Sequence, residues 1–144
     1  MTEIYDHALL RGPMDIACPR CGGRAVFSTR HDKALPVTVR RADGTILTDN
    51  RDGQVGCTAC GHAASHTLDW PGQAWFQVEY RGQVLWAKDR AMMTEIRRFI
   101  AAGADRNAIG KTSEWWRYLL RIPAIFLSAR ARDPILRKID KRLA

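Results

Sequence analysis

The stretches Cys18-Pro19-Arg20-Cys21-Gly22 and Cys57-Thr58-Ala59-Cys60-Gly61 hold all four cysteines of this 144-residue chain. Each stretch reads Cys-x-x-Cys-Gly. A two-residue turn brings both sulfurs of a pair to one side, and the glycine behind it can take the positive φ that closes the turn. Two such turns supply the four sulfur ligands that Zn²⁺ takes in a tetrahedral structural site. We therefore predict a structural zinc site formed by Cys18, Cys21, Cys57 and Cys60.

Two other uses of the same cysteines compete with zinc. An iron centre of the rubredoxin type also takes four thiolates, and a redox dithiol also uses the Cys-x-x-Cys spacing. A redox pair favours a single motif where a strand meets a helix, whereas both pairs here are surrounded by turn and strand residues. No cysteine is left over, which favours metal ligands over disulfides in a reducing compartment. His62 follows the second pair closely, but four thiolates leave it no ligand position, and we expect an exposed side chain or a donor near the sulfurs.

Length and composition indicate an ordinary globular protein. The chain is long enough for one modest core, and its apolar fraction of 46% and charged fraction of 26% are typical of such proteins. The first residues carry two acids and lead into no long apolar stretch, so we expect no secretory signal. No apolar run approaches the roughly 18 residues of a membrane span. We therefore expect a cytoplasmic location.

The positive charge is unevenly distributed along the chain. There are 23 Lys and Arg against 15 Asp and Glu, a formal net charge of +8. Residues 1–64 and residues 65–110 each carry +1, whereas residues 111–144 carry nine Lys and Arg against three Asp and Glu, which gives +6. The basic character therefore belongs to the C-terminal segment.

The segment between the cysteine pairs predicts strands and a hairpin. Residues 24–29 and 62–70 read as strands that follow the first and the second pair. Between them, residues 37–48 alternate apolar and polar side chains around Asp43-Gly44, which is a strong hairpin signal. This inserted hairpin accounts for the 35 residues that separate the two pairs. Doubling a flexible loop costs only about 0.6 kcal/mol, whereas zinc-linked folding contributes on the order of 10 kcal/mol.

The second half of the chain predicts one more hairpin and then helices. Aromatic and β-branched runs flank Arg81-Gly82 and predict a hairpin over residues 74–87. Asp89 predicts the N-cap of an amphipathic helix that ends before Gly103. Further helices are predicted over residues 113–122 and, with Asp133 as cap and Pro134 in the first turn, at the C-terminal end.

These elements predict an α+β fold. We expect an N-terminal metal-binding β region with an inserted hairpin, a second hairpin, and C-terminal helices. The corresponding segments are residues 1–70, residues 71–110 with the second hairpin and its amphipathic helix, and the basic helical residues 111–144.

Residues 18–70 resemble the zinc-ribbon superfamily, known from transcription factors, polymerase subunits and ribosomal proteins. The resemblance rests on the four cysteines and on Gly22 and Gly61, and it covers roughly a third of the chain. The inserted hairpin departs from the minimal three-stranded ribbon. Leu85–Arg90 and the tail Arg121–Leu143 also resemble small bacterial zinc-ribbon proteins of unassigned function. The resemblance implies a zinc-ribbon fold and a structural zinc ion, and it implies no activity.

Catalysis is not predicted from the sequence. Four thiolates would fill the zinc coordination shell and leave no position for a reactive water. Gly110-Lys111-Thr112 looks like the end of a phosphate-binding loop, but that motif requires glycine where this chain has Asp105, and a strand where a helix is predicted. We therefore expect a protein that is not an enzyme.

Two classes of partner are compatible with the sequence. Phosphate contacts come mainly from Lys and Arg, so the leading hypothesis is contact with nucleic acid or a nucleoprotein machine through six residues of the tail: Arg130, Arg132, Arg137, Lys138, Lys141 and Arg142. Arg20, Arg40 and Arg41 could extend that surface. The alternative is a protein-interaction or regulatory adaptor module, because the chain has five tryptophans and exposed Trp and Arg favour interfaces. Binding to an anionic membrane surface and a zinc-thiolate redox sensor are weaker hypotheses.

Overall fold

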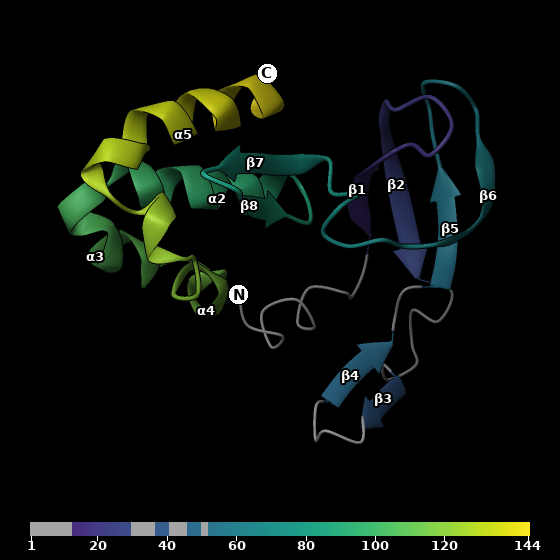
Figure 1. The fold of residues 1–144 in the computed structure, drawn as a ribbon, viewed down its shortest axis with the longest axis horizontal. Coiled ribbons are helices and arrows are strands. Elements are labelled where there is room, and N and C mark those ends of the chain that lie inside the picture. Colours follow the sequence, from purple (N-terminus) through teal and green to yellow (C-terminus); the bar gives the residue numbers. More distant parts are fainter. Residues whose placement is uncertain (1–12, 30–36, 41–45, 50–51) are drawn as a thin grey trace. The chain divides into compact units, whose positions relative to one another are not determined.

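The computed structural model describes residues 13–29, 37–40, 46–49 and 52–144. The chain divides into two compact units, residues 2–74 and residues 75–144. Antiparallel sheets and helices are both present, so the fold is α+β as predicted (Figure 1). The finer division into three segments stays a prediction. Within the described residues, no helix has the length and apolar character needed to cross a membrane.

A four-stranded antiparallel sheet organises residues 2–74. The strand order is β1-β2-β5-β6, and the strands are β1 (Met14–Ala17), β2 (Arg24–Thr29), β5 (Asp52–Gly56) and β6 (Ala63–Thr67). Alternate residues point to one face, where Met14, Ile16, Phe27 and Val55 are buried. Leu68, Trp70 and Ala74 are also buried in this unit. Strand β1 was not predicted, although Met14 and Ile16 flank Asp15 in the alternating pattern of a half-buried strand.

The inserted hairpin is confirmed by the backbone. Strands β3 (Val37–Arg40) and β4 (Ile46–Asp49) pair antiparallel, with Val37 opposite Asp49 and Arg40 opposite Ile46. Because β2 pairs directly with β5, the hairpin is an insertion between two neighbouring strands of the larger sheet. The predicted turn at Asp43-Gly44 and the side chain of Arg41 lie outside the described residues.

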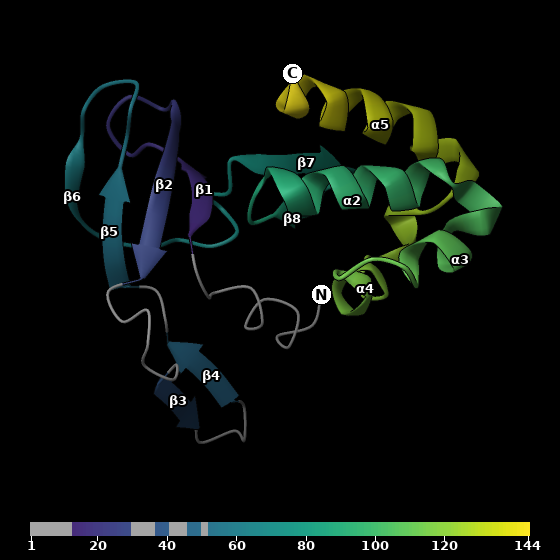
Figure 2. The same cartoon turned by 180° about the vertical axis from the view of Figure 1, so that it is seen from behind.

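The unit formed by residues 75–144 is a hairpin covered by helices. Strands β7 (Phe76–Tyr80) and β8 (Gln83–Ala87) pair as predicted, and helices α2 (Arg90–Ala101) and α5 (Ala129–Leu143) contact β8 and β7 respectively. The two helices also contact each other and run side by side in both views (Figures 1 and 2). The shorter elements are η1 (Gly103–Asp105), α3 (Arg106–Gly110), α4 (Trp116–Leu119) and η2 (Ala124–Phe126).

Local chemistry explains helix α2. The Asp89 side chain accepts a hydrogen bond from the Met92 amide at 2.9 Å, which is the predicted N-cap. Gly103 takes a φ of +57° just beyond the helix end. The predicted apolar stripe is buried: Met92, Met93, Ile96, Phe99 and Ile100.

Two predicted helices have different bounds in the structure. The helix predicted over residues 113–122 is reduced to the single turn of α4, since its N-cap has no side-chain hydrogen bond and Pro123 disfavours helical backbone before it. The last helix begins at Ala129 rather than near Pro134, because Ser128 caps it by accepting from the Ala131 amide at 3.1 Å. Pro134 therefore lies inside α5. Burial of Ala131, Ile135 and Ile139 along one face offsets the hydrogen bond that the proline removes.

Candidate metal centre

The sheet topology brings the two cysteine pairs together. Cys18 and Cys21 lie in the turn that joins β1 to β2, and Cys57 and Cys60 lie in the turn that joins β5 to β6. Strands β2 and β5 are antiparallel neighbours, with Val26 opposite Gly56. The beginning of β2 and the end of β5 therefore lie at the same end of the sheet, and both turns project from that end.

The two turns have the same geometry. In each, the amide of the glycine donates to the carbonyl of the first cysteine at 2.9 Å: Gly22 to Cys18 and Gly61 to Cys57. Both glycines have a φ of +76°, as the sequence predicted. A non-glycine residue in either place would adopt a strained backbone, so the glycine completes each turn.

The four sulfurs fit a tetrahedral ion. All four ligand atoms lie within 4.8 Å of one another. The Sγ atoms of Cys18 and Cys60 are 3.8 Å apart, and those of Cys21 and Cys57 are 3.6 Å apart. A tetrahedron with Zn–S bonds of about 2.3 Å has edges of about 3.8 Å. The cluster is thus compatible with a metal ion of zinc's size, and it consists of the four predicted cysteines.

Backbone amides favour a thiolate at Cys18. The amides of Cys21 and Arg20 donate to its sulfur at 3.5 and 3.4 Å. The hydrogen bond from Cys21 has the largest effect. Together these hydrogen bonds lower the pKa of Cys18 to about 6, although burial of the sulfur acts in the opposite direction. The Gly23 amide also donates to the Cys21 sulfur at 3.3 Å.

The other sulfurs oppose ionisation of Cys21. The hydrogen bond from Gly23 lowers the pKa of Cys21, but interaction with the Cys57 and Cys60 side chains raises it, and the net pKa is about 11. Closely spaced thiols cannot all become thiolates unless a cation compensates their charges. The four cysteines can therefore all be thiolates at this spacing only where a cation is bound.

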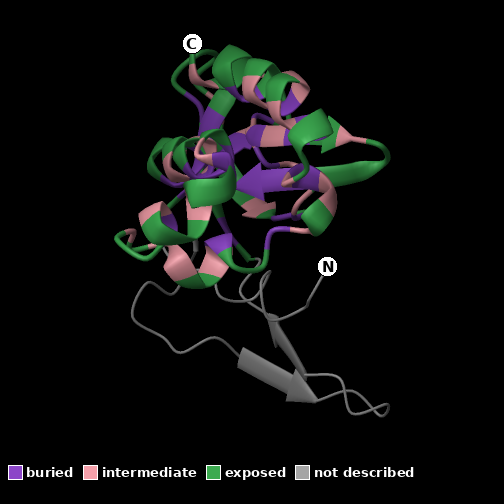
Figure 3. Cartoon of the chain, turned by 90° about the vertical axis from the view of Figure 1, so that its left-hand side faces the viewer, coloured by how far each residue is buried: buried purple, intermediate pink, exposed green. Residues whose placement is uncertain are grey.

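The structure places the six predicted basic residues on different sides of helix α5. Successive residues of a helix are separated by about 100°, which places Arg130, Arg137 and Lys141 on the side of α5 opposite the buried Ala131, Ile135 and Ile139. All three cations are exposed. In Figure 3, the ribbon coloured by burial shows exposed residues along the helix that leads to the C-terminus.

The other three predicted cations contact other residues of the same unit. The Lys138 Nζ donates to the Glu79 carbonyl at 2.6 Å, and the Arg142 guanidinium lies over the Trp75 ring, 5.0 Å from its centroid. The Arg132 guanidinium lies against Gly103, where a Cβ atom would be 2.8 Å from its Nη2. Sequence reasoning missed these contacts because their partners are distant in the chain. Arg20 is exposed in the first cysteine turn, and nothing is described for the Arg40 side chain.

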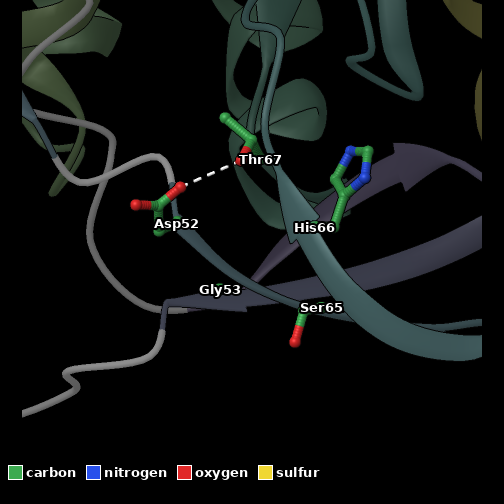
Figure 4. Close-up of a pocket in the computed structure, with 5 residues that line it drawn as sticks. All are labelled: Asp52, Gly53, Ser65, His66 and Thr67. Carbon is green, nitrogen blue, oxygen red and sulfur yellow. Dashed lines mark hydrogen bonds between the residues drawn. The ribbon is translucent and has the colours of Figure 1, made fainter.

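A polar pocket lies between β5 and β6, apart from the cysteines. It has a volume of about 290 Å³ and is lined by Asp52, Gly53, Ser65, His66 and Thr67 (Figure 4). The Thr67 hydroxyl donates to Asp52 Oδ1 at 3.0 Å. Since the Gln73 amide oxygen can only accept, the 2.8 Å contact makes His66 Nε2 the donor. Alternate strand residues point to opposite faces, so His66 and the hydroxyls of Ser65 and Thr67 leave β6 on different faces and do not form a nucleophile and base pair.

Fold and site together define an α+β protein with a four-cysteine cluster able to hold a metal ion. No known family matches the chain, and no curated protein or solved structure matches it either.

Proposed function

We propose that the chain is a zinc-ribbon protein in which one structural Zn²⁺, held by Cys18, Cys21, Cys57 and Cys60, stabilises the sheet of residues 2–74. The observation that carries the proposal is the spacing of the four sulfurs, which matches the edges of a zinc tetrathiolate. The sequence resemblance and the paired glycine turns support it. Four thiolate ligands leave no open coordination position, so the proposed site is not catalytic.

Metal analysis of the purified full-length chain tests this proposal. We expect one zinc per chain, and Co²⁺ in its place should show the visible absorption of a tetrahedral cobalt with four thiolate ligands. The double variant Cys21→Ser/Cys60→Ser removes one exposed ligand from each turn and should lose the metal. Thr58→Ser in the same turn is the matched control and should keep it. One iron per chain would support the rubredoxin-type alternative, and a stably folded chain that binds no metal would refute both.

We further propose that residues 75–144 contact nucleic acid or a nucleoprotein complex. The charge distribution supports this: residues 75–144 hold fifteen Lys and Arg against seven Asp and Glu, a net charge of +8, whereas residues 2–74 hold eight of each. The alternative is a protein partner, and it has weaker support. Leu120 is 58% exposed next to Arg121, but Trp115 and Trp116 are only partly exposed and contact Tyr118 and Phe99.

Co-purification from the native cell, with and without nuclease, separates the two classes of partner. A nucleic-acid partner should be lost from the sample after nuclease treatment. A discrete protein that remains bound after nuclease would favour the adaptor hypothesis instead. Zinc content measured on the same sample links the partner to the metal-loaded chain.

A further inference from the structure

The outward face of α5 carries cations without acidic partners. Among the residues that the structure describes, the ion pairs are Arg24 with Asp15, Arg97 with Asp140 and Arg98 with Glu95. None of them involves Arg130, Arg137 or Lys141. Asp133 lies three residues from Arg130 and four from Arg137, and none of these ion pairs includes it. Asp140 is held by Arg97 through two hydrogen bonds. The three cations of this outward face, Arg130, Arg137 and Lys141, are therefore free for an external anion.

The same unit has no fully exposed aromatic side chain on which bases could stack. Within the described part of the chain, the exposed large apolar residues are Val26, Val84 and Leu120, and none is aromatic. Several aromatic rings that reach the surface are instead covered by a cation of the protein itself: Trp75 by Arg142, Tyr80 by Arg81 and Trp115 by Lys88. Binding of single strands depends on stacking of bases on aromatic side chains. The geometry therefore disfavours a single-stranded partner.

Helix α5 also lacks the amide and hydroxyl side chains that read base edges. After its cap it contains no Asn, Gln, Ser or Thr, and its outward face is formed by Lys, Arg and Asp. Asn and Gln supply the bidentate contacts to adenine, whereas Lys and Arg contact phosphates and, among the bases, guanine. This composition is suited to the phosphate backbone.

Resting on the proposed nucleic-acid function, we infer that Arg130, Arg137 and Lys141 bind the phosphate backbone of duplex nucleic acid without sequence preference. We also infer that this binding does not require the metal, because these residues and the core that holds α5 belong to residues 75–144, whereas all four cysteines belong to residues 2–74. Residues 2–74 would then bind the metal, and residues 75–144 would bind the duplex.

The test is a salt titration of the zinc-loaded, full-length chain with a labelled duplex of random sequence. Each phosphate contact contributes a slope of about −0.9 to log affinity against log salt. Three contacts predict a slope of about −2.7, or roughly a 40-fold loss of affinity between 50 and 200 mM salt. The variant Arg130→Gln/Arg137→Gln/Lys141→Gln should lose that slope. Lys111→Gln/Arg117→Gln/Arg121→Gln, which removes the same charge from exposed positions of the same unit, should keep it.

Several outcomes would overturn the inference. Equal losses in the two triple variants would mean that net charge, and not the outward face of α5, binds the duplex. Tighter binding of a single strand of the same length, or of anionic phospholipid vesicles, would assign the surface to another partner. After chelation of the metal, loss of duplex affinity or of the helical circular-dichroism signal would refute independence from the metal. If no nucleic acid binds even at low salt, the proposed function itself fails, while the metal analysis stands separately.

Discussion

Two glycines of the same strand allow a sharp test of the sheet packing. In β5, a Cβ atom added at Gly53 would overlap the Ser28 carbonyl oxygen and lie 2.8 Å from Phe27 Cζ. A Cβ atom added at Gly56 would meet nothing within 4 Å. Neither glycine has a positive φ. The substitutions Gly53→Ala and Gly56→Ala therefore make the same chemical change in one strand but meet opposite surroundings.

The expected effects on the free energy of unfolding have opposite signs. Replacing glycine by alanine restricts the unfolded chain and stabilises a protein by about 0.4–1 kcal/mol where the new methyl group fits. Overpacking of a filled site costs about 1–3 kcal/mol, and a carbonyl oxygen cannot move away by changing rotamer. We expect Gly56→Ala to be neutral or slightly stabilising. Gly53→Ala should destabilise the sheet by about 1–2 kcal/mol.

Hydrogen exchange measured by mass spectrometry on the zinc-loaded chain reports the stability of each strand separately. A loss of 1–2 kcal/mol should make the amides of β2 and β5 exchange roughly 5- to 30-fold faster in Gly53→Ala. Peptides from α5, which belongs to the other unit, serve as the internal reference. Unchanged protection in Gly53→Ala, or equal effects of the two substitutions, would show that β2 and β5 are not packed as described.

Three further predictions concern residues 75–144. Asp89→Ala should destabilise this unit by about 0.5–2 kcal/mol through loss of the α2 cap, and Asp89→Asn should retain most of the stability in urea unfolding. Ile139→Ala, at a fully buried position, should lower the free energy of unfolding by about 2–5 kcal/mol. Leu136→Ala, on the same helix, should lower it by less. Equal losses would refute the assigned buried face of α5. Hydrogen bonding and charge from Arg97 lower the pKa of Asp140, so the stabilisation from this pair is present at neutral pH and is lost as acid protonates Asp140. Asp140→Asn should therefore lower the stability of this unit only slightly at pH 7, because the pair is exposed to solvent, and a difference from wild type that persisted at pH 2 would contradict the pairing.

The cluster and the hairpins could be predicted because short-range chemistry specifies them. The spacing within each cysteine pair and the glycine behind it determine a turn whatever surrounds it, and Asp89 and Gly103 mark helix α2 in the same local way. That the two pairs meet depends on the pairing of β2 with β5. From the sequence, the contact between the two pairs could be inferred only because a structural zinc ion needs four ligands and each pair supplies two.

Predictions that depended on tertiary contacts were less successful. Pro134 is a strong start signal when read locally, yet α5 continues through it because the residues on both sides of the proline bury one continuous apolar face. The six basic residues of the tail looked equivalent in the sequence. Their roles differ because Glu79, Trp75 and Gly103, all distant in the chain, engage Lys138, Arg142 and Arg132. Only a structure could separate these three from the residues of the outward face.

The unequal construction of the two units explains why one of them would need a metal. In residues 2–74 the described sheet buries one face, while the other carries Asp52, Gln54 and Ser65 in exposed positions and leaves Val26 42% exposed. Small sheets with one buried face gain little from the hydrophobic effect and commonly depend on a metal or disulfides. In residues 75–144, by contrast, a hairpin and two helices bury apolar side chains from three directions, including Trp86, Phe99 and Ile135. The proposed metal-independent binding by the outward face of α5 rests on this core, which contains none of the four cysteines.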